Sequence, residues 1–316
     1  MPVPRPRLRY SAFEPALDSA DRAWTVVLAG GDDPAVDADD TDDGDGRGLV
    51  PRAYLRAAGA PAPLEQTLDR LGRLTPPARI LTVVGPHHLE LGLSLLHGRS
   101  DHVLCQPALR DTAFGLYVAL AMVRRWAPRA VVTIAPVATR LPIARTGVAH
   151  LAAARRLAAV LVDQVVVIGG SPPTSDQAPL CVPAAAGPAP VVPALCPAPG
   201  PSGWQVEQAG APWCIASACA SVDATWALGR VTSPRLLDIL DSLVPLVGTP
   251  DEDDAIDYIY RAFRPVNFAR DMVARAPWRC VSMPLEGSPS RWQSVLERPA
   301  GAAGGAVTDR RRPDPS

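Results

Sequence analysis

The hydrophobic pattern of this 316-residue chain alternates between short, continuous apolar runs and longer segments of helical period. Short apolar runs bounded by Gly or Pro are typical of strands that are buried on both faces of a parallel sheet. They predict strands at 24–29, 80–84, 102–105, 130–135, 164–168, 213–222 and 280–285. Apolar residues at helical spacing predict helices at 64–74, 87–97, 112–126, 146–160, 234–244, 252–264, 268–276 and 289–298.

Strands that alternate with helices predict consecutive βαβ units and hence an α/β fold. We expect a Rossmann-like three-layer sandwich with a mostly parallel central sheet. One folded domain is expected over 21–298, after a flexible, Pro- and Arg-rich arm at 1–20. Residues 171–203 contain ten prolines, too many for central strands, and are interpreted as a Pro-rich, low-complexity insertion. Residues 299–316 are predicted to form a disordered tail.

The charged side chains nearly balance, with 31 basic and 32 acidic residues and a formal net charge of −1. This balance argues against nucleic acid and against an anionic membrane surface as a partner. No apolar run approaches the ~20 residues of a membrane span, and no apolar stretch follows the basic residues at 1–9. The six cysteines include no Cys-x-x-Cys pair, so the sequence predicts a cytoplasmic protein with free, buried thiols and no zinc site.

The segment 24–31, Trp-Thr-Val-Val-Leu-Ala-Gly-Gly, predicts a buried strand that ends at a phosphate-binding turn. Gly30 and Gly31 are expected there because glycine adopts positive φ and lets the backbone approach a ligand. The following segment, 32–45, is unusual because it contains eight aspartates and no basic residue. Such a run is typical of a solvated loop, and its alternative role is a Mg²⁺ or Ca²⁺ site.

Several short strings, in this order and spacing, resemble a known family. They are Val-Val-Leu-Ala-Gly-Gly at 26–31, Pro-Arg-Ala-Tyr-Leu at 51–55, Leu-Glu-Gln-Thr-Leu-Asp-Arg-Leu at 64–71, Gln-Pro-Ala-Leu-Arg-Asp-Thr-Ala at 106–113, Ala-Val-Val-Thr-Ile-Ala-Pro at 130–136 and Val-Asn-Phe-Ala-Arg-Asp-Met-Val at 266–273. Over 24–298 the chain resembles the sugar-1-phosphate nucleotidyltransferases, in particular their mannose-1-phosphate guanylyltransferase branch. The resemblance implies a sheet of the nucleotide-diphospho-sugar transferase type.

The resemblance also implies a reaction, in which a sugar 1-phosphate attacks the α-phosphorus of a nucleotide and releases pyrophosphate with the help of Mg²⁺. It implies that GTP or another NTP contacts Gly30, Gly31, Gln106, Arg110 and Thr112. Arg52 falls on the basic position of the family's Pro-Lys motif and is the catalytic candidate. The chain contains no lysine, so a guanidinium must supply any positive charge that the reaction needs.

The sequence departs from the family at the positions of its phosphate-binding and metal-binding residues. The acid run replaces the arginine of the phosphate loop, and Ala138 stands where a metal-binding aspartate is expected. The second metal-binding aspartate, expected near the C-terminal end, is also absent after Glu286. We therefore predict no metal ligand from the family's motifs.

Three functions remain open at this stage. One is an enzyme of the family that keeps some activity through substitute metal ligands from the acid run. The second is a catalytically inactive homologue that binds a nucleotide or nucleotide sugar, as a homo-oligomer or paired with an active relative. The third, a dinucleotide-dependent oxidoreductase, is disfavoured because no Gly-x-Gly-x-x-Gly follows the first strand.

Two local interpretations also have structural alternatives. Arg110 and Thr112 precede and open a helix, where they suit contacts with a base or phosphate, but Asp111 or Thr112 is equally suited to cap that helix. His87 and His88 are interpreted as ordinary surface groups, because adjacent residues of a helix do not face one shared ion.

Overall fold

The computed structural model describes residues 23–30, 51–56, 60–86, 88–137, 145–170, 205–208 and 211–284. For residues 52, 145–146, 170, 205–208, 211–214 and 284 it describes the backbone alone. The predicted arm, Pro-rich insertion, helix at 289–298 and tail lie outside these ranges, as do Gly31, the acid segment 32–45, His87 and Ala138.

The described strands form one sheet of eight. They are β1 (Ala23–Ala29), β2 (Ile80–Val84), β3 (His102–Cys105), β4 (Val131–Pro136), β5 (Val165–Gly170), β6 (Gln205–Gln208), β7 (Ala211–Ser221) and β8 (Cys280–Pro284). Their order is β3-β2-β1-β4-β7-β5-β8, and β6 pairs with β7. Strand β7 is antiparallel to β4, β5 and β6, whereas the remaining pairs are parallel. The sheet is therefore mostly parallel, which confirms the predicted fold class.

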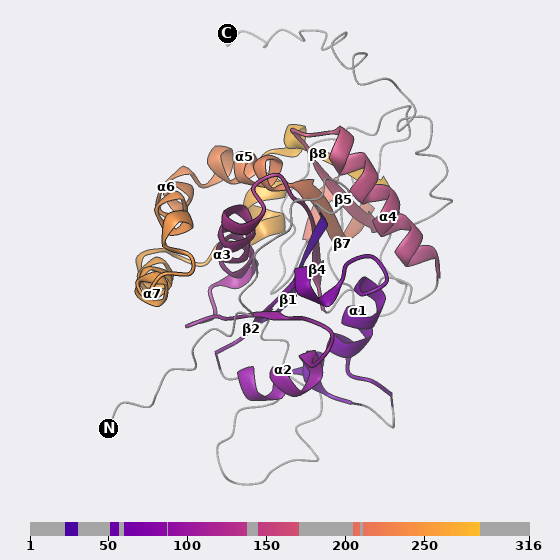
Figure 1. Cartoon of the computed structure of the whole chain (residues 1–316). Coiled ribbons are helices and arrows are strands. Elements are labelled where there is room, and N and C mark those ends of the chain that lie inside the picture. Colours follow the sequence, from indigo (N-terminus) through magenta and orange to yellow (C-terminus); the bar gives the residue numbers. More distant parts are fainter. Residues whose placement is uncertain are drawn as a thin grey trace, which may run out of the picture.

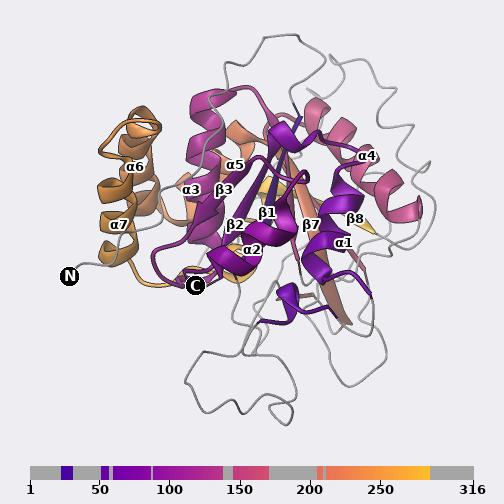
Figure 2. The same cartoon turned by 60° about the horizontal axis from the view of Figure 1, so that its bottom comes forward.

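Helices cover both faces of this sheet (Figure 1 and Figure 2). They are α1 (Pro63–Leu71), α2 (Leu89–Leu96), α3 (Asp111–Trp126), α4 (Arg145–Val160), α5 (Val222–Thr232), α6 (Pro234–Leu243) and α7 (Glu252–Ala262). The core on one face contains residues of α3, α5, α6 and α7, and the core on the other contains residues of α1, α2 and α4. The molecule is thus a three-layer α/β sandwich of the Rossmann type.

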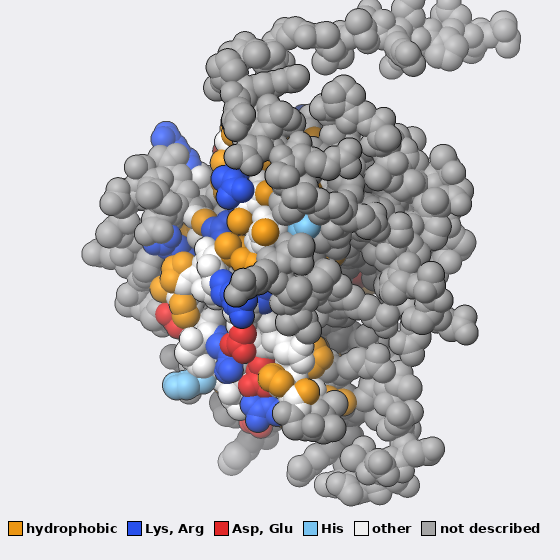
Figure 3. All heavy atoms as spheres, turned by 90° about the vertical axis from the view of Figure 1, so that its right-hand side faces the viewer, with side chains coloured by type: hydrophobic (Ala, Val, Ile, Leu, Met, Phe, Trp, Pro, Cys, Tyr) orange, Lys and Arg blue, Asp and Glu red, His pale blue; other side chains and the backbone are white. Residues whose placement is uncertain are grey.

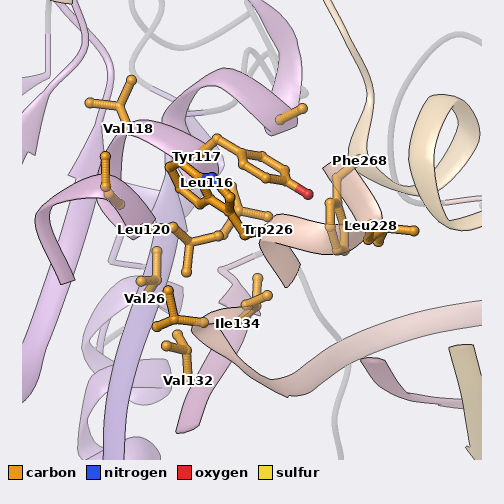
Figure 4. Close-up of a cluster of buried hydrophobic side chains, with 14 of the residues drawn as sticks. Val26, Leu116, Tyr117, Val118, Leu120, Val132, Ile134, Trp226, Leu228 and Phe268 are labelled. Atoms are coloured by element: carbon orange, nitrogen blue, oxygen red, sulfur yellow. The ribbon is translucent and has the colours of Figure 1, made fainter. Parts of the chain in front are cut away.

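Neighbouring residues of the central strand β1 belong to opposite cores. Val26 packs with the α3 side of the sheet, close to Leu116 and Leu120 in Figure 4, whereas Val27 packs with the α1 side and Leu68. Because successive side chains of a strand point to opposite faces, a strand covered on both faces is apolar throughout. This is why the continuous apolar runs of the sequence identified the strands.

The structure differs from the predicted elements at three places. Strand β7 ends at Ser221, whose side-chain oxygen accepts a hydrogen bond from the Ala224 N–H at 2.9 Å and caps α5, a helix that the sequence pattern missed. The pattern also missed the short strand β6. The predicted helix at 268–276 is a π-helix over Phe268–Val273.

Charged side chains of both signs lie next to one another on the face shown in Figure 3. Ion pairs such as Arg56–Glu65 and Arg99–Asp69 tie α1 to its neighbouring segments. This mixture of basic and acidic side chains agrees with the near-zero net charge of the chain.

Cys105, Cys219 and Cys280 are free thiols, of which Cys219 and Cys280 are buried as predicted and Cys105 is half-buried, and burial raises the pKa of each. None of the helices in the described ranges has the length and apolar character that crossing a membrane requires.

Candidate functional site

The carboxyl ends of four parallel strands meet at one edge of the sheet. Ala29 of β1 lies beside Val84 of β2, and Val84 lies beside Cys105 of β3. On the other side of β1, the Val137 N–H that follows β4 donates to the Leu28 carbonyl at 3.0 Å. Ligands of open α/β sheets bind outside the carboxyl ends of the strands, so this edge is the first place to look for a site.

Gly30, directly after β1, shares its space with the side chain of Gln106. A Cβ on residue 30 would lie 2.0 Å from Gln106 Nε2, which is far inside van der Waals contact. The same amide lies against the start of α3, where a Cβ on Gly115 would be 2.9 Å from Gln106 Oε1. At both positions a Cβ would force the Gln106 amide to shift, and the positive φ predicted for Gly30 is wrong, because its φ lies outside the left-handed region.

Gln106 itself is buried, with 5% of its surface exposed. Its backbone N–H donates to the Val84 carbonyl at 3.0 Å, and its side-chain Oε1 accepts a hydrogen bond from the Tyr260 hydroxyl at 3.0 Å. The resemblance implied a direct nucleotide contact for this residue, which stays a prediction. In the structure its side chain lies beside Gly30 at the end of β1 and bonds to Tyr260.

A tyrosine that the sequence analysis did not single out holds the same strand end from the other side. The Tyr54 hydroxyl donates to the Ala29 carbonyl at 2.7 Å, and burial raises the pKa of this hydroxyl above its usual range. Tyr54 ends the short turn Arg52–Tyr54, so this hydrogen bond ties the turn to the carboxyl end of β1. The side chain of Arg52 is outside the described part of the structure.

His88 belongs to the same neighbourhood and is not an ordinary surface group. Its ring packs against that of Tyr54, with 5.3 Å between ring centroids. Its Nδ1 atom is buried and would lie 2.7 Å from a Cβ on Gly85, the residue that follows β2. The interpretation of this histidine as a solvated residue is corrected, because Gly85 leaves room for the imidazole beside the strand end.

The start of α3 is occupied by a segment from the C-terminal part of the chain. Thr112 Oγ1 accepts a hydrogen bond from the Phe268 N–H at 3.0 Å. Asp111, which has a φ of 63°, accepts from the Thr112 N–H at 2.6 Å and from Asn267 Nδ2 at 3.0 Å. Thr112 and Asp111 thus bond mainly to the segment at Asn267 and Phe268, and the predicted capping of α3 by either side chain is wrong, because no side chain caps this helix. Arg110 differs, because its buried Nε atom has no hydrogen-bond partner among the described residues.

The partner segment is itself held by capping interactions. The Asn267 side chain accepts from the Arg270 N–H at 2.8 Å, while the Asp271 carboxylate accepts from the Asn267 N–H at 2.8 Å. Burial alone would raise the pKa of Asp271, but Arg270 and the Asn267 N–H hold that pKa below its usual value. The π-helix that follows Asn267 is a conformation that is frequent near functional sites.

The residues described at this edge do not fit a Mg²⁺ site. Asp111 is the carboxylate that opens α3, and Thr112 and Asn267 already use its Oδ1 atom. Within the described ranges, no three His, Cys, Asp or Glu side chains gather closely enough to hold a metal ion. We therefore derive no step through a metal from these residues.

Comparison with known proteins adds evidence on the fold. No protein-family model matches the sequence, and no curated protein matches it. Solved structures do match. A crystal structure of mannose-1-phosphate geranyltransferase from Thermus thermophilus is 18% identical, covers 86% of this chain and 78% of its own, and has a TM-score of 0.61. A crystal structure of mannose-6-phosphate isomerase from Helicobacter pylori is 10% identical, covers 84% and 98%, and has a TM-score of 0.55.

What they share with this chain is the fold. At these identities the likeness shows a common Rossmann-like architecture. Any activity has to be argued from the residues at the edge of the sheet.

Of the predicted contact residues, the structure brings Gly30 and Gln106 together and places Arg110 and Thr112 at the start of α3. Sequence reasoning missed Tyr54 and Tyr260. Tyr54 lay within a string that carried the resemblance and could have been noticed there, whereas no local signal links Tyr260 to Gln106.

Proposed function

We propose that this chain binds a nucleotide or nucleotide sugar at the carboxyl edge of its sheet, as a relative of the sugar-1-phosphate nucleotidyltransferases. The observation that carries the proposal is the packing of Gln106 into the space that Gly30 leaves open at the end of β1. A strand end that is fixed this closely, at the edge where α/β folds bind ligands, suits a turn that presents its backbone to phosphate groups.

The positive charge for the phosphates falls to arginine, because the chain contains no lysine. Arg110 is the favoured residue, since its Nε has no hydrogen-bond partner in the described part of the chain and Thr112 next to it is already engaged. Arg52 is the second proposed contact, because the turn that contains it is tied to β1 through Tyr54.

We further propose that this chain has kept ligand binding and has lost catalysis. Ala138 follows β4 at the position where the resemblance implies a metal-binding aspartate. Loss of ligands from a metal-assisted transfer removes stabilisation of the charge that develops in the transition state, and each ~1.4 kcal/mol lost slows the reaction about tenfold. On this view the protein acts by binding its ligand, alone, as a homo-oligomer or beside an active relative.

Calorimetric titration of the full chain with GTP, ATP and GDP-mannose, with and without Mg²⁺, tests the binding proposal. We expect at least one of these ligands to bind in the micromolar range, and Arg110→Gln to weaken that binding about tenfold. Arg129→Gln is the matched control, because Arg129 is exposed in the turn before β4, at the opposite edge of the sheet. Absence of binding by the wild type to all three ligands would contradict the proposal.

A second candidate is an active nucleotidyltransferase whose metal ligands come from the acid segment 32–45. It is favoured by one observation, the eight aspartates that follow the Gly30 turn directly in sequence. Incubation with GTP, mannose 1-phosphate and Mg²⁺, followed by measurement of released pyrophosphate, separates the two. Turnover near ~1 s⁻¹ or above, an ordinary enzymatic rate, would establish the enzyme and refute the inactive homologue.

A further inference from the structure

Tyr260 links a distant helix to the strand end at which we propose nucleotide binding. The residue lies in α7 and is almost completely buried, with 1% of its surface exposed. Its hydroxyl donates to Gln106 Oε1 at 3.0 Å, although 154 positions separate the two residues in the sequence. The tyrosine ring is held in turn by Phe114 of α3, with 5.5 Å between ring centroids.

This hydrogen bond determines how the Gln106 amide is oriented. With Oε1 facing Tyr260, the Nε2 side of the amide faces Gly30, where a Cβ would lie 2.0 Å away. On the α3 side the amide lies beside Gly115, where a Cβ would be 2.9 Å from its Oε1 atom. The position of the Gly30 backbone is therefore coupled to the position of the Tyr260 hydroxyl through one buried amide.

We propose that Tyr260 is a positioning residue of the nucleotide site, acting through Gln106 on the Gly30 backbone at the end of β1. This inference rests on the proposed function, because it needs the end of β1 to contact the ligand. Burial raises the pKa of the Tyr260 hydroxyl, which keeps it protonated, and therefore a hydrogen-bond donor, near neutral pH. We expect its effect on binding to be geometric.

The chain supplies a matched control for its removal. Tyr117 is also fully buried, and its hydroxyl donates to the Thr225 carbonyl at 2.7 Å within the core shown in Figure 4. Tyr117→Phe and Tyr260→Phe each remove one buried hydroxyl and one hydrogen bond. We expect the two variants to lose similar amounts of thermal stability, since the chemical change is the same.

Ligand binding distinguishes a positioning role of Tyr260 from a purely structural role such as that of Tyr117. Tyr260→Phe should raise the Kd for GTP about fivefold or more in calorimetric titration, and that for inorganic tripolyphosphate by a similar factor, because the Gly30 backbone shifts. Tyr117→Phe should leave both values within about twofold of the wild type. Gln106→Ala removes the acceptor of the same hydrogen bond. In a Gln106→Ala background, Tyr260→Phe should therefore have no further effect on the Kd.

Each outcome decides the proposal. Equal Kd values for Tyr260→Phe and wild type overturn it, and so does an equal loss in Tyr117→Phe, which would indicate general loosening of the core. If Tyr260→Phe fails to fold, the Gln106→Ala variant decides alone, and unchanged binding there overturns the proposal. A wild type that binds neither GTP nor tripolyphosphate overturns the proposed function first and this inference with it.

Discussion

The side chain of Gln106 fills the space beside Gly30: its Nε2 atom lies 2.0 Å from the point where a Cβ on residue 30 would be. The two residues come from different strand ends, one after β1 and the other after β3. Their contact is what joins the end of the central strand to the segment that follows β3.

Because of this contact, the effect of Gly30→Ala should depend on residue 106. In the wild type the new methyl group must displace the Gln106 side chain, which leaves the buried Tyr260 hydroxyl without its acceptor and costs about 1–3 kcal/mol of unfolding free energy. In a Gln106→Ala background the same change should be nearly neutral, because the φ of Gly30 is outside the left-handed region. Urea unfolding of the four proteins measures the coupling, and additive effects would contradict the shared space.

Asp111 opens α3 in the left-handed conformation, with a φ of 63°. Asn tolerates this conformation and keeps an Oδ1 acceptor for the Thr112 N–H and for Asn267, so Asp111→Asn should change stability little. Asp111→Ala loses both hydrogen bonds and suffers the steric cost of positive φ, about 1–3 kcal/mol in total. Asp111→Gly should fall between them. Chemical unfolding of the three variants gives the order, and an alanine variant as stable as the asparagine variant would refute this account.

Glu65 should make the protein sensitive to acid. Its carboxylate accepts two hydrogen bonds from the Arg56 guanidinium, at 2.6 and 2.8 Å, and one from the Ala62 N–H at 3.0 Å. The Arg56 hydrogen bonds are the main reason why the pKa of Glu65 is lowered from 4.5 to about 2. The resulting stabilisation is fully present above the unfolded pKa of 4.5 and is lost as the pH falls toward 2.

We therefore expect the stability difference between wild type and Glu65→Gln to be largest near neutral pH and to shrink between pH 4.5 and 2. Thermal unfolding across this pH range provides the measurement. Arg56→Met is the control, because removal of the guanidinium returns the pKa of Glu65 toward its ordinary value and flattens the acid dependence. A constant difference at all pH values would show that the carboxylate charge has no part in the effect.

The acid segment 32–45 should weaken nucleotide binding. Its aspartates follow Gly30 in sequence, and if they lie over the ligand they repel a triphosphate by about 1 kcal/mol per unit pair at 4 Å in water. Replacement of the eight aspartates by Ser and Gly should lower the Kd for GTP without restoring turnover, and added salt should produce part of the same gain in the wild type. Loss of Mg²⁺-dependent GTP binding in the neutralised variant would instead identify the segment as a substitute metal site.

The sequence by itself determined the fold class, because burial on both sides of a parallel sheet leaves a local mark. Runs such as 24–29 and 80–84 are apolar at nearly every position, and the helices between them keep their period. It also marked the end of β1 as special through Gly30, and the resemblance drew attention to Gln106 at the end of β3. These signals lie within short stretches of the chain, so a pattern reveals them.

Only the tertiary structure decided what those residues do. The antiparallel direction of β7 and the occupation of the α3 start by Asn267 and Phe268 depend on which segments meet after folding. The Gln106 amide fills the space that a Cβ on residue 30 would need, and its Oε1 atom accepts a hydrogen bond from Tyr260 of α7. A hydrogen bond or a steric contact between distant segments leaves no periodic trace in a sequence, since it is specified by the packing of whole layers and not by neighbours in the chain.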